Sequence, residues 1–357
     1  MRIAQVAPLW ERVPPPRYGG IELIVGLLTD ELVRRGHEVT LFASGDSQTL
    51  AKLEATSPRA LRLDPTIQNP AVYDMLHLSK VQEQAENFDV IHFHTWIPPF
   101  QLTEYIKTAT VYTLHGNFTS EINQLYSRYR NHNFVSISDA QRQSGPDLNY
   151  VGTVYNGIDV NAYPFYPEAQ SPAYLAFLGR MSPQKGPHHA IAIAKQVGLP
   201  LKMAGKVDPV DKTFYEEEIA PLIDGEQIQF LGEVNHSKKL ELLGNAIATL
   251  FPITWQEPFG LVMIESMCVG APVIGMKLGS VAEVVDHGKT GFVCSDVAEM
   301  PAAIAEISKL NRQHCHDFVN RRFSVNQMVD DYEAAYRKTL SERMSRNGHC
   351  RNAMIAL

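Results

Sequence analysis

The stretch that decides the fold reads AIATLFPI at residues 246–253 and, three residues later, EPFGLVMIE at residues 257–265. The first run is apolar and β-rich, which predicts a buried strand. Apolar residues then recur at helical spacing from Leu261 to Cys268, and Pro258 suits a first helical turn because it has no N–H to leave unpaired. The stretch therefore predicts a strand, a loop and a helix, the repeating unit of α/β domains.

The predicted loop places the carboxylate of Glu257 beside the first-turn amides of the helix. Those amides and the helix dipole favour an anion such as phosphate, and Gly260 lets a ligand come close to the backbone. A carboxylate at this place suits a ligand that also brings hydroxyl donors, as a sugar does. Glu265 follows after eight residues, which in a helix rise about 12 Å. A glycosidase holds its two carboxylates only roughly 5–9.5 Å apart, so we expect this pair to hold opposite ends of a long ligand. In the alternative, neither carboxylate binds a ligand: the helix dipole favours an acidic residue at position 257, and Glu265 is exposed to solvent.

Length and composition predict a globular protein of two domains. The chain has 357 residues, more than one ordinary hydrophobic core holds. Of these residues 45% are hydrophobic, as in a typical globular protein. With 32 basic and 39 acidic residues the net charge is −7, so no nucleic-acid partner is expected. The first residues lack the apolar core of a signal peptide, and no apolar run approaches the ~20 residues of a membrane span. We expect a cytoplasmic protein and leave a peripheral membrane contact open.

The first half alternates strands and helices. A strand at 3–7, a helix at 21–35 and a strand at 38–43 form a βαβ unit, which implies a parallel sheet. The loop between the first two ends in Gly19-Gly20 and lacks the Gly-x-Gly-x-x-Gly pattern, which disfavours a dinucleotide-dependent dehydrogenase. Residues 47–70 look irregular. The remaining predicted elements are a helix at 73–86 and buried strands at 88–94, 110–116, 134–138 and 151–155.

The second half repeats the alternation after a proline-rich linker at 163–172. We predict a first domain at 1–165, a second at 166–324, a helix at about 325–342 that packs back on the first domain, and a tail at 343–357. The expected strands of the second half are 173–178, 201–204, 227–231 and 272–275, and the expected helices are 188–197, 237–243, 300–310 and 325–340.

Arg180 and Lys185 lie in one loop after a predicted strand, between Gly179 and Gly186. In open α/β sheets ligands bind at the carboxyl ends of the strands. A diphosphate carries charge that a guanidinium and an ammonium can neutralise. Two solvated cations are the alternative, but the flanking glycines and the strand end favour phosphate binding.

His92, His94 and His115 stand at strand ends. Three histidines raise the question of zinc, but their spacing is not that of a zinc site, and no metal is expected. A packed or capping histidine is the default for any one of them. Among the three, His94 is the strongest functional candidate. The four cysteines also lack metal-ligand spacing and are expected to be buried thiols in a reducing compartment.

Together these motifs resemble the family-four retaining nucleotide-sugar glycosyltransferases of GT-B architecture, from residue 1 to about 340. That architecture has two Rossmann-like domains with parallel sheets facing across a cleft. The motifs that carry the resemblance are Gly19-Gly20-Ile21-Glu22, His92-Phe93-His94, Thr113-Leu114-His115-Gly116, Ser136-Ile137-Ser138, Asn156-Gly157-Ile158-Asp159, Gly179-Arg180 with Lys185-Gly186, Phe230-Leu231-Gly232, Glu257 with Glu265, and Gly288-Lys289-Thr290-Gly291-Phe292.

The resemblance implies a role for each matching position. Arg180 and Lys185 would bind the donor diphosphate, and Glu265 would hold the ribose. Glu257 would bind the donor sugar, helped by the amides of Phe259, Gly260 and Leu261. His94 would lie beside the sugar near the reacting carbon. The remaining implied contacts are Gly19 and Gly20 to phosphate or acceptor, Val234 to the base, and His115 and Asn156 on the acceptor side.

The implied reaction is metal-independent transfer, with retention, from a donor such as a UDP- or GDP-sugar to a saccharide, lipid or small-molecule acceptor. No further cofactor is implied. Many members have Gly-Gly where this chain has Gly279-Ser280 before Glu283, which puts the phosphate loop in question. A nucleotide-sugar 2-epimerase of the same architecture and a non-catalytic sugar-nucleotide-binding protein are the alternatives.

Overall fold

The computed structural model describes residues 1–16, 19–95 and 97–355, which divide into two compact units. The first unit comprises Met1–Ile137, Arg142–Gly157 and Val325–Leu357, and the second comprises Ser138–Gln141 and Ile158–Ser324. Residues 158–165, which the sequence analysis placed in the first domain, belong to the second unit.

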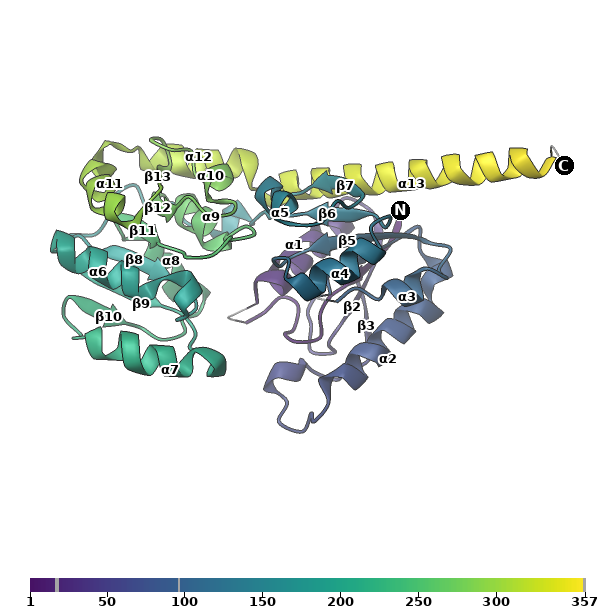
Figure 1. Ribbon diagram of the computed structural model, residues 1–357, viewed down its shortest axis with the longest axis horizontal. Helices are drawn as coiled ribbons and strands as arrows, with labels where there is room; N and C mark the ends of the chain where they lie inside the picture. The colour runs from purple at the N-terminus through teal and green to yellow at the C-terminus, as the bar shows by residue number, and fades with distance from the viewer. Residues whose placement is uncertain (17–18, 96, 356–357) are drawn as a thin grey trace. The chain divides into compact units, whose positions relative to one another are not determined.

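The first unit is built on a seven-stranded parallel sheet with the order β3-β2-β1-β4-β5-β6-β7 (Figure 1). In a Rossmann-type sheet of this kind the order in which successive strands are added reverses between β1 and β4, and this position is called the topological switch point. The strands are β1 (Arg2–Val6), β2 (Glu38–Ala43), β3 (Lys52–Ala55), β4 (Val90–Phe93), β5 (Ala109–Leu114), β6 (Phe134–Ser136) and β7 (Tyr150–Thr153). The helices are α1 (Gly20–Arg34), α2 (Pro70–Glu83), α3 (Phe100–Thr103), α4 (Ser120–Arg128), α5 (Asp139–Ser144) and α13 (Val325–Ile355).

The last helix, α13, packs on the first sheet against β5, β7 and α1. The residues from 343 onward, expected as a tail, continue this helix to Ile355. The opposite face of the sheet carries an apolar cluster with Val81 of α2 and Tyr126 of α4. The sheet is therefore covered on both faces, as a parallel sheet requires.

The second unit has a six-stranded parallel sheet with the equivalent order β10-β9-β8-β11-β12-β13. Its strands are β8 (Leu175–Leu178), β9 (Leu201–Ala204), β10 (Ile228–Phe230), β11 (Ala248–Phe251), β12 (Val273–Met276) and β13 (Gly291–Cys294). Its helices are α6 (Pro187–Val197), α7 (Lys212–Phe214), α8 (His236–Gly244), α9 (Leu261–Cys268), α10 (Val281–Val284), α11 (Met300–Glu306) and α12 (Arg312–Arg322). The two sheets confirm the predicted α/β fold class with two Rossmann-like domains.

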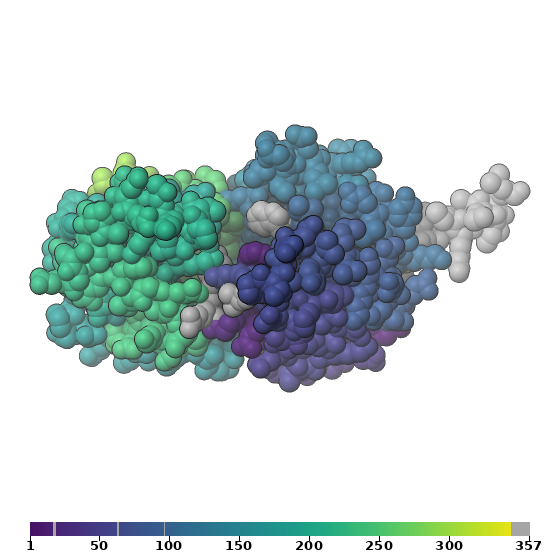
Figure 2. All heavy atoms as spheres, turned by 90° about the horizontal axis from the view of Figure 1, so that it is seen from below, coloured from purple at the N-terminus to yellow at the C-terminus, as the bar shows by residue number. Residues whose placement is uncertain are grey.

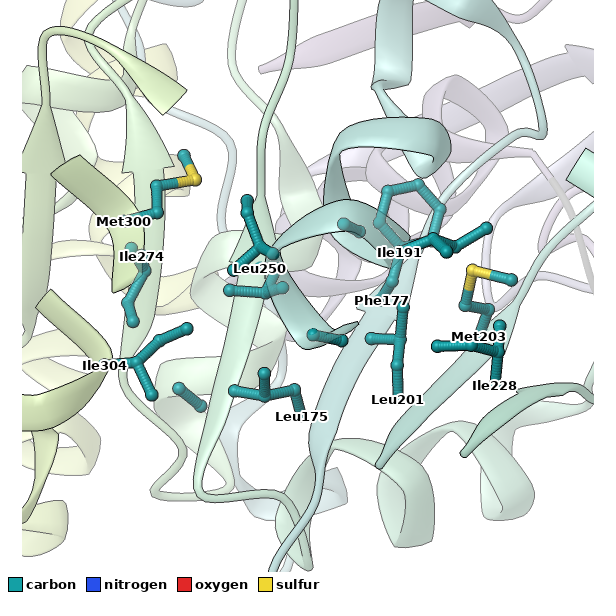
Figure 3. Packing of buried hydrophobic residues seen from close by; sticks show 14 of the residues in the cluster. Leu175, Phe177, Ile191, Leu201, Met203, Ile228, Leu250, Ile274, Met300 and Ile304 are labelled. Carbon is teal, nitrogen blue, oxygen red and sulfur yellow. The ribbon is translucent and has the colours of Figure 1, made fainter. Parts of the chain in front are cut away.

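The core of the second unit lies between its sheet and helices α6 and α11. Phe177, Leu250 and Ile274 from the strands meet Ile191 of α6 and Ile304 of α11 (Figure 3). In space-filling view the surface of this unit is teal to green (Figure 2). Helix α9 packs on β11 and β12 and against α8 and α12. This packing anchors the helix whose N-terminus the sequence analysis singled out.

Two local predictions were wrong. The stretch 47–70 was expected to be irregular, but it contains the edge strand β3. Pro258 was expected in the first turn of α9, but that helix begins at Leu261 behind a left-handed Gly260 with φ +78°. Residues 257–260 are thus not helical, and the rise of about 12 Å expected between Glu257 and Glu265 from helix geometry loses its basis.

Candidate functional site

Two loops meet at the switch point of the second sheet, where the neighbouring strands β8 and β11 end. The loop after β8 carries Lys185-Gly186, and the loop after β11 begins at Pro252. Gly186 has φ +72°, and a Cβ atom on it would lie 2.0 Å from the carbonyl oxygen of Pro252. Only glycine fits both the conformation and the space. This close approach brings Lys185 to the Glu257 loop.

Lys185 forms an ion pair with the buried carboxylate of Glu257. The indole N–H of Trp255 donates to the same carboxylate at 2.9 Å, and the Lys185 ammonium lies 5.0 Å from the centre of the Trp255 ring. The ammonium therefore has a carboxylate and an aromatic face as neighbours. The two residues that the sequence analysis assigned to phosphate and to sugar lie side by side.

Arg180 is held more loosely than Lys185. Its guanidinium nitrogens lie 3.7 Å from Asp208 Oδ2 and 3.9 Å from Asp211 Oδ2, and one donates to Gln184 Oε1 at 3.3 Å. Contacts of this length are weak, so the N–H groups can turn toward a stronger acceptor such as a phosphate oxygen.

Glu265 is buried inside α9 and has two partners. The Tyr163 hydroxyl donates to its Oε1 at 3.0 Å, and the Lys239 ammonium forms an ion pair with the same oxygen. Burial, and then the neighbouring Glu265 charge, raise the pKa of Tyr163, so this hydroxyl stays protonated and donates. Oε1 of Glu265 is thus held by two donors.

The loop that precedes α9 is held in place by Gly279 and Ser280. The Ser280 N–H donates to the Glu257 carbonyl at 2.9 Å, and its hydroxyl donates to the Phe259 carbonyl at 2.8 Å. A Cβ atom on Gly279 would lie 2.1 Å from that Glu257 carbonyl oxygen. The serine at the position where the resemblance expects a second glycine therefore serves the structure, because it fixes residues 257–260.

In the first unit, the glycine pair forms the turn that opens α1. Gly19 has φ +141° and accepts the Leu23 N–H at 3.1 Å, and α1 begins at Gly20. A Cβ atom on Gly19 would lie 2.8 Å from Cβ of Pro15. Glu22 in the first helical turn is buried, and burial raises its pKa to about 7.

Glu22 predicts a pH effect on stability. The pKa of Glu22 is about 7 in the folded chain and 4.5 ordinarily, so the folded chain binds this proton more tightly than the unfolded chain does. The stabilisation of the folded state by this proton is fully present below pH 4.5 and is lost as the pH rises through 7. Glu22→Gln should therefore stabilise the protein by about 2–3 kcal/mol at pH 8 and leave it unchanged near pH 4. Thermal unfolding across this range measures the difference, with exposed Glu86→Gln as the control. Equal effects of Glu22→Gln at both ends would contradict the prediction.

His94 and His115 are in contact with each other in the first unit. His94 Nδ1 lies 2.9 Å from His115 Nε2, and His94 Nε2 lies 2.9 Å from Gln5 Oε1. His94 is fully buried, whereas His115 is partly exposed. Burial lowers the pKa of His94 well below its usual range and that of His115 to about 3, so both rings are neutral.

A pocket opens over His115 within the first unit. The apolar part of its wall is Ile21, Phe118, Ile122 and Tyr126, and the polar part includes His94, Thr113 and His115. The cavity volume is about 20 Å³, about the space that one water molecule needs, so the pocket accepts a single hydroxyl-sized group. The structure thus places His115 and the N-terminal end of α1 at one small pocket.

The other two candidates lie apart from these clusters. Asn156 is buried after β7, and its Oδ1 has no hydrogen-bond partner in the described part of the chain. Val234 is partly exposed in the loop between β10 and α8. The structure brings neither of them into the contacts described above.

Sequence reasoning missed Tyr163, Lys239 and Trp255. Trp255 stands two residues before Glu257, and this closeness was an available signal. Tyr163 and Lys239 are distant in sequence from Glu265, and only the folded chain joins them.

The described ranges offer neither a metal site nor a membrane span. No group of three or more histidine, cysteine, aspartate or glutamate residues in them could hold a metal ion. None of the helices described is long and apolar enough to cross a membrane.

Two family models together match most of the chain. Residues 18–162 match the model described as Glycosyltransferase Family 4, and residues 164–323 match Glycosyl transferases group 1. The chain is 27% identical to glycogen synthase of Mycobacterium tuberculosis over 86% of both chains. It is 26% identical to N-acetyl-alpha-D-glucosaminyl L-malate synthase of Bacillus anthracis over 93% of this chain and 97% of that one.

Solved structures show the same fold. Sucrose-phosphate synthase of Thermosynechococcus elongatus matches with a TM-score of 0.76 and 19% identity over 96% of this chain and all of that one. The Anabaena protein HepE in complex with UDP and glucose matches with a TM-score of 0.73 and 21% identity over 96% of this chain and 100% of that one. With the family models and the two Rossmann-like sheets, these matches lead to one conclusion: the chain belongs to the family-four glycosyltransferases of GT-B fold.

Proposed function

We propose that the protein transfers a sugar, with retention and without a metal ion, from a nucleotide-diphosphate sugar to a hydroxyl acceptor. The observation that carries the proposal is the Lys185–Glu257 pair at the switch point of the second sheet. It joins a phosphate-binding cation to a hydroxyl-binding carboxylate, and a nucleotide-diphosphate sugar presents both groups next to each other.

The donor half-site lies in the second unit. Lys185 and Arg180 bind the diphosphate, and the first-turn amides of α9, from Leu261 onward, add partial positive charge. When a phosphate of the donor pairs with the Lys185 ammonium in place of Glu257, the Glu257 carboxylate can accept hydrogen bonds from sugar hydroxyls. Glu265 accepts the ribose hydroxyls, and Val234 lies toward the base. The HepE structure with UDP and glucose supports a donor of this class.

The charge of the leaving nucleotide is balanced by side chains in this proposal. Arg180 and Lys185 neutralise the diphosphate as the bond to the sugar breaks, together with the helix terminus. No cofactor is needed beyond the donor itself.

The first unit binds the reacting sugar and the acceptor. Both ring nitrogens of His94 are occupied and the ring is buried, so we assign direct contact with a sugar hydroxyl to His115 and make His94 its support. The small pocket over His115 receives a hydroxyl group, and the acceptor is a saccharide, lipid or small molecule that the first unit binds around it. Gly19 and Gly20 shape its approach. Asn156 Oδ1, which has no hydrogen-bond partner among the described residues, is a further acceptor-side group.

In the proposed reaction the acceptor oxygen attacks the anomeric carbon on the face from which the nucleotide leaves. The carbon–oxygen bond to the diphosphate breaks as the new glycosidic bond forms, and the departing phosphate takes the proton of the acceptor. Glu257 acts as a binding group and forms no covalent bond with the sugar.

The test is a thermal-shift panel of nucleotide sugars followed by transfer assays. A true donor at about 100-fold its Kd should stabilise the protein by about 2.7 kcal/mol. The selected donor is then offered saccharide, lipid and small aglycone acceptors, and NMR of the product reads the anomeric configuration. A product of inverted configuration would contradict retention, and stabilisation by no nucleotide sugar would contradict the donor class.

A further inference from the structure

A chain of hydrogen bonds runs through the first unit from the pocket to the last helix. It crosses the neighbouring strands β1, β4 and β5 and reaches α13. Its members, in order, are His115, His94, Gln5, Tyr336, His92, Thr113 and Tyr332. All of them except His115 are buried. Three members, His94, Thr113 and His115, line the pocket, and among them only His115 is partly exposed. His115 is also the histidine to which we assign contact with the sugar.

Strand register creates this chain. Gln5 of β1 lies opposite His92 of β4, so both side chains project on one face of the sheet. His94 follows His92 by two residues and therefore projects on the same side. Helix α13 covers this face and supplies the two tyrosines. The alternate positions, such as Ile91 and Phe93, project into the apolar cluster on the other face.

The carboxamide of Gln5 decides which nitrogen of each histidine carries the proton. Its Nε2 donates to the Tyr336 hydroxyl at 2.9 Å, so its Oε1 faces His94 Nε2 at 2.9 Å. Because Oε1 can only accept, His94 Nε2 is protonated and the neutral ring accepts at Nδ1. His115 then donates from Nε2 across 2.9 Å and keeps a lone pair on Nδ1. No partner for this Nδ1 occurs among the residues that the structure describes.

The other half of the hydrogen-bond chain sets the orientation of the Gln5 carboxamide. Since the Tyr336 oxygen accepts from Gln5, its single proton is directed to His92 Nδ1 at 2.7 Å. His92 then donates from Nε2 to Thr113 Oγ1, also at 2.7 Å. If Gln5 turned over, Tyr336 and His92 would have to reverse their protons too. The direction of each bond is therefore coupled to all the others.

We propose that Tyr336 and Gln5 are positioning residues that hold His115 as its Nε2–H tautomer, so that Nδ1 accepts a hydrogen bond from a sugar hydroxyl in the pocket. The sugar contact rests on the proposed function, whereas the tautomer does not. In the opposite tautomer Nδ1 would carry a proton and could not accept. The last helix of the chain thereby selects the hydrogen-bonding character of a site residue to which it is linked only through Gln5 and His94 in the described hydrogen bonds.

Long-range proton–nitrogen NMR of the full chain, labelled with ¹⁵N-histidine, tests the tautomer directly. The wild-type spectrum should show His115 with a protonated Nε2 and an unprotonated Nδ1. Tyr336→Phe removes both the acceptor for Gln5 and the proton for His92, so His115 should become a mixture of tautomers. Tyr112→Phe is the matched control, because it removes an equally buried hydroxyl on the other face of the same sheet, outside the hydrogen-bond chain. A protonated Nδ1 in the wild type, or an unchanged His115 in Tyr336→Phe, would overturn the proposal.

Kinetics test the consequence of the tautomer. Tyr336→Phe should lower kcat about tenfold, the scale of one lost hydrogen bond, while Tyr112→Phe should change it less than about twofold. In a His115→Ala background, Tyr336→Phe should have almost no further effect on kcat. An undiminished effect in that background would show that Tyr336 acts on kcat independently of His115 and would reject the positioning role.

These readouts separate the two claims. If no nucleotide sugar is turned over, the proposed function fails, but the NMR spectrum still decides the tautomer. If transfer proceeds and His115→Ala keeps wild-type kcat, the sugar contact fails while the donor assignment stands.

Discussion

Replacing Lys185 by alanine should lower kcat for sugar transfer by about 10²–10³-fold, the loss typical of one group that stabilises developing charge. Lys185 is the cation closest to Glu257, and its removal has a second consequence. The Glu257 carboxylate would keep only the Trp255 N–H as a described side-chain donor, and its charge would then repel the diphosphate. Both effects act in the same direction, so this variant should be among the most damaging.

The matched control is Lys195→Ala, which removes an exposed lysine from α6 in the same unit. It should leave kcat and the thermal midpoint near wild type. Steady-state kinetics with the best donor, together with circular dichroism of each variant, separates a catalytic loss from unfolding. Near-wild-type turnover by folded Lys185→Ala would reject the diphosphate assignment. Lys185→Ala combined with Glu257→Gln should recover part of the donor affinity, because the uncompensated charge is then gone.

The architecture could be predicted because its signals are local. Strand β9 was expected at 201–204 and occupies those residues, since LKMA, with Lys202 as its one charged residue, lies between Gly198-Leu199-Pro200 and Gly205 and has few alternatives. Strand β3 was missed because its sequence, KLEA, carries charges, as edge strands commonly do. The start of α9 was misplaced because Pro258 fits a helical first turn, whereas the left-handed Gly260 that precedes the helix has no unique sequence signal.

The candidate site could be predicted only in part, for a similar reason. Arg180, Lys185 and Glu257 stand at strand ends, and strand order brings such ends together at the switch point. The partners of the site residues depend on tertiary contacts that the sequence does not indicate. Asp208 pairs with Arg180, and Lys239 pairs with Glu265. Strand register likewise decides which histidine meets the pocket.

The affinity for the nucleotide should depend most strongly on Glu265. Glu265→Gln keeps the size of the side chain and an oxygen for the Tyr163 hydroxyl, but it removes the negative charge paired with Lys239. A hydrogen bond to a charged acceptor contributes about 1.5–3 kcal/mol, so Kd for the free nucleoside diphosphate should rise about 10- to 100-fold. Isothermal titration calorimetry measures this change without any need for an acceptor.

The control for this variant is Glu241→Gln, which neutralises an exposed glutamate on α8. Glu265→Gln also leaves the Lys239 ammonium without its carboxylate, so some loss of thermal stability is expected from this variant alone. Stability and affinity must therefore be compared in one preparation: a lower midpoint with unchanged Kd would mean that Glu265 serves the fold and not the ribose. A raised Kd for nucleoside diphosphates with an unchanged Kd for inorganic pyrophosphate would instead place Glu265 at the nucleoside end of the donor, because pyrophosphate reaches Lys185 and Arg180 but has no ribose.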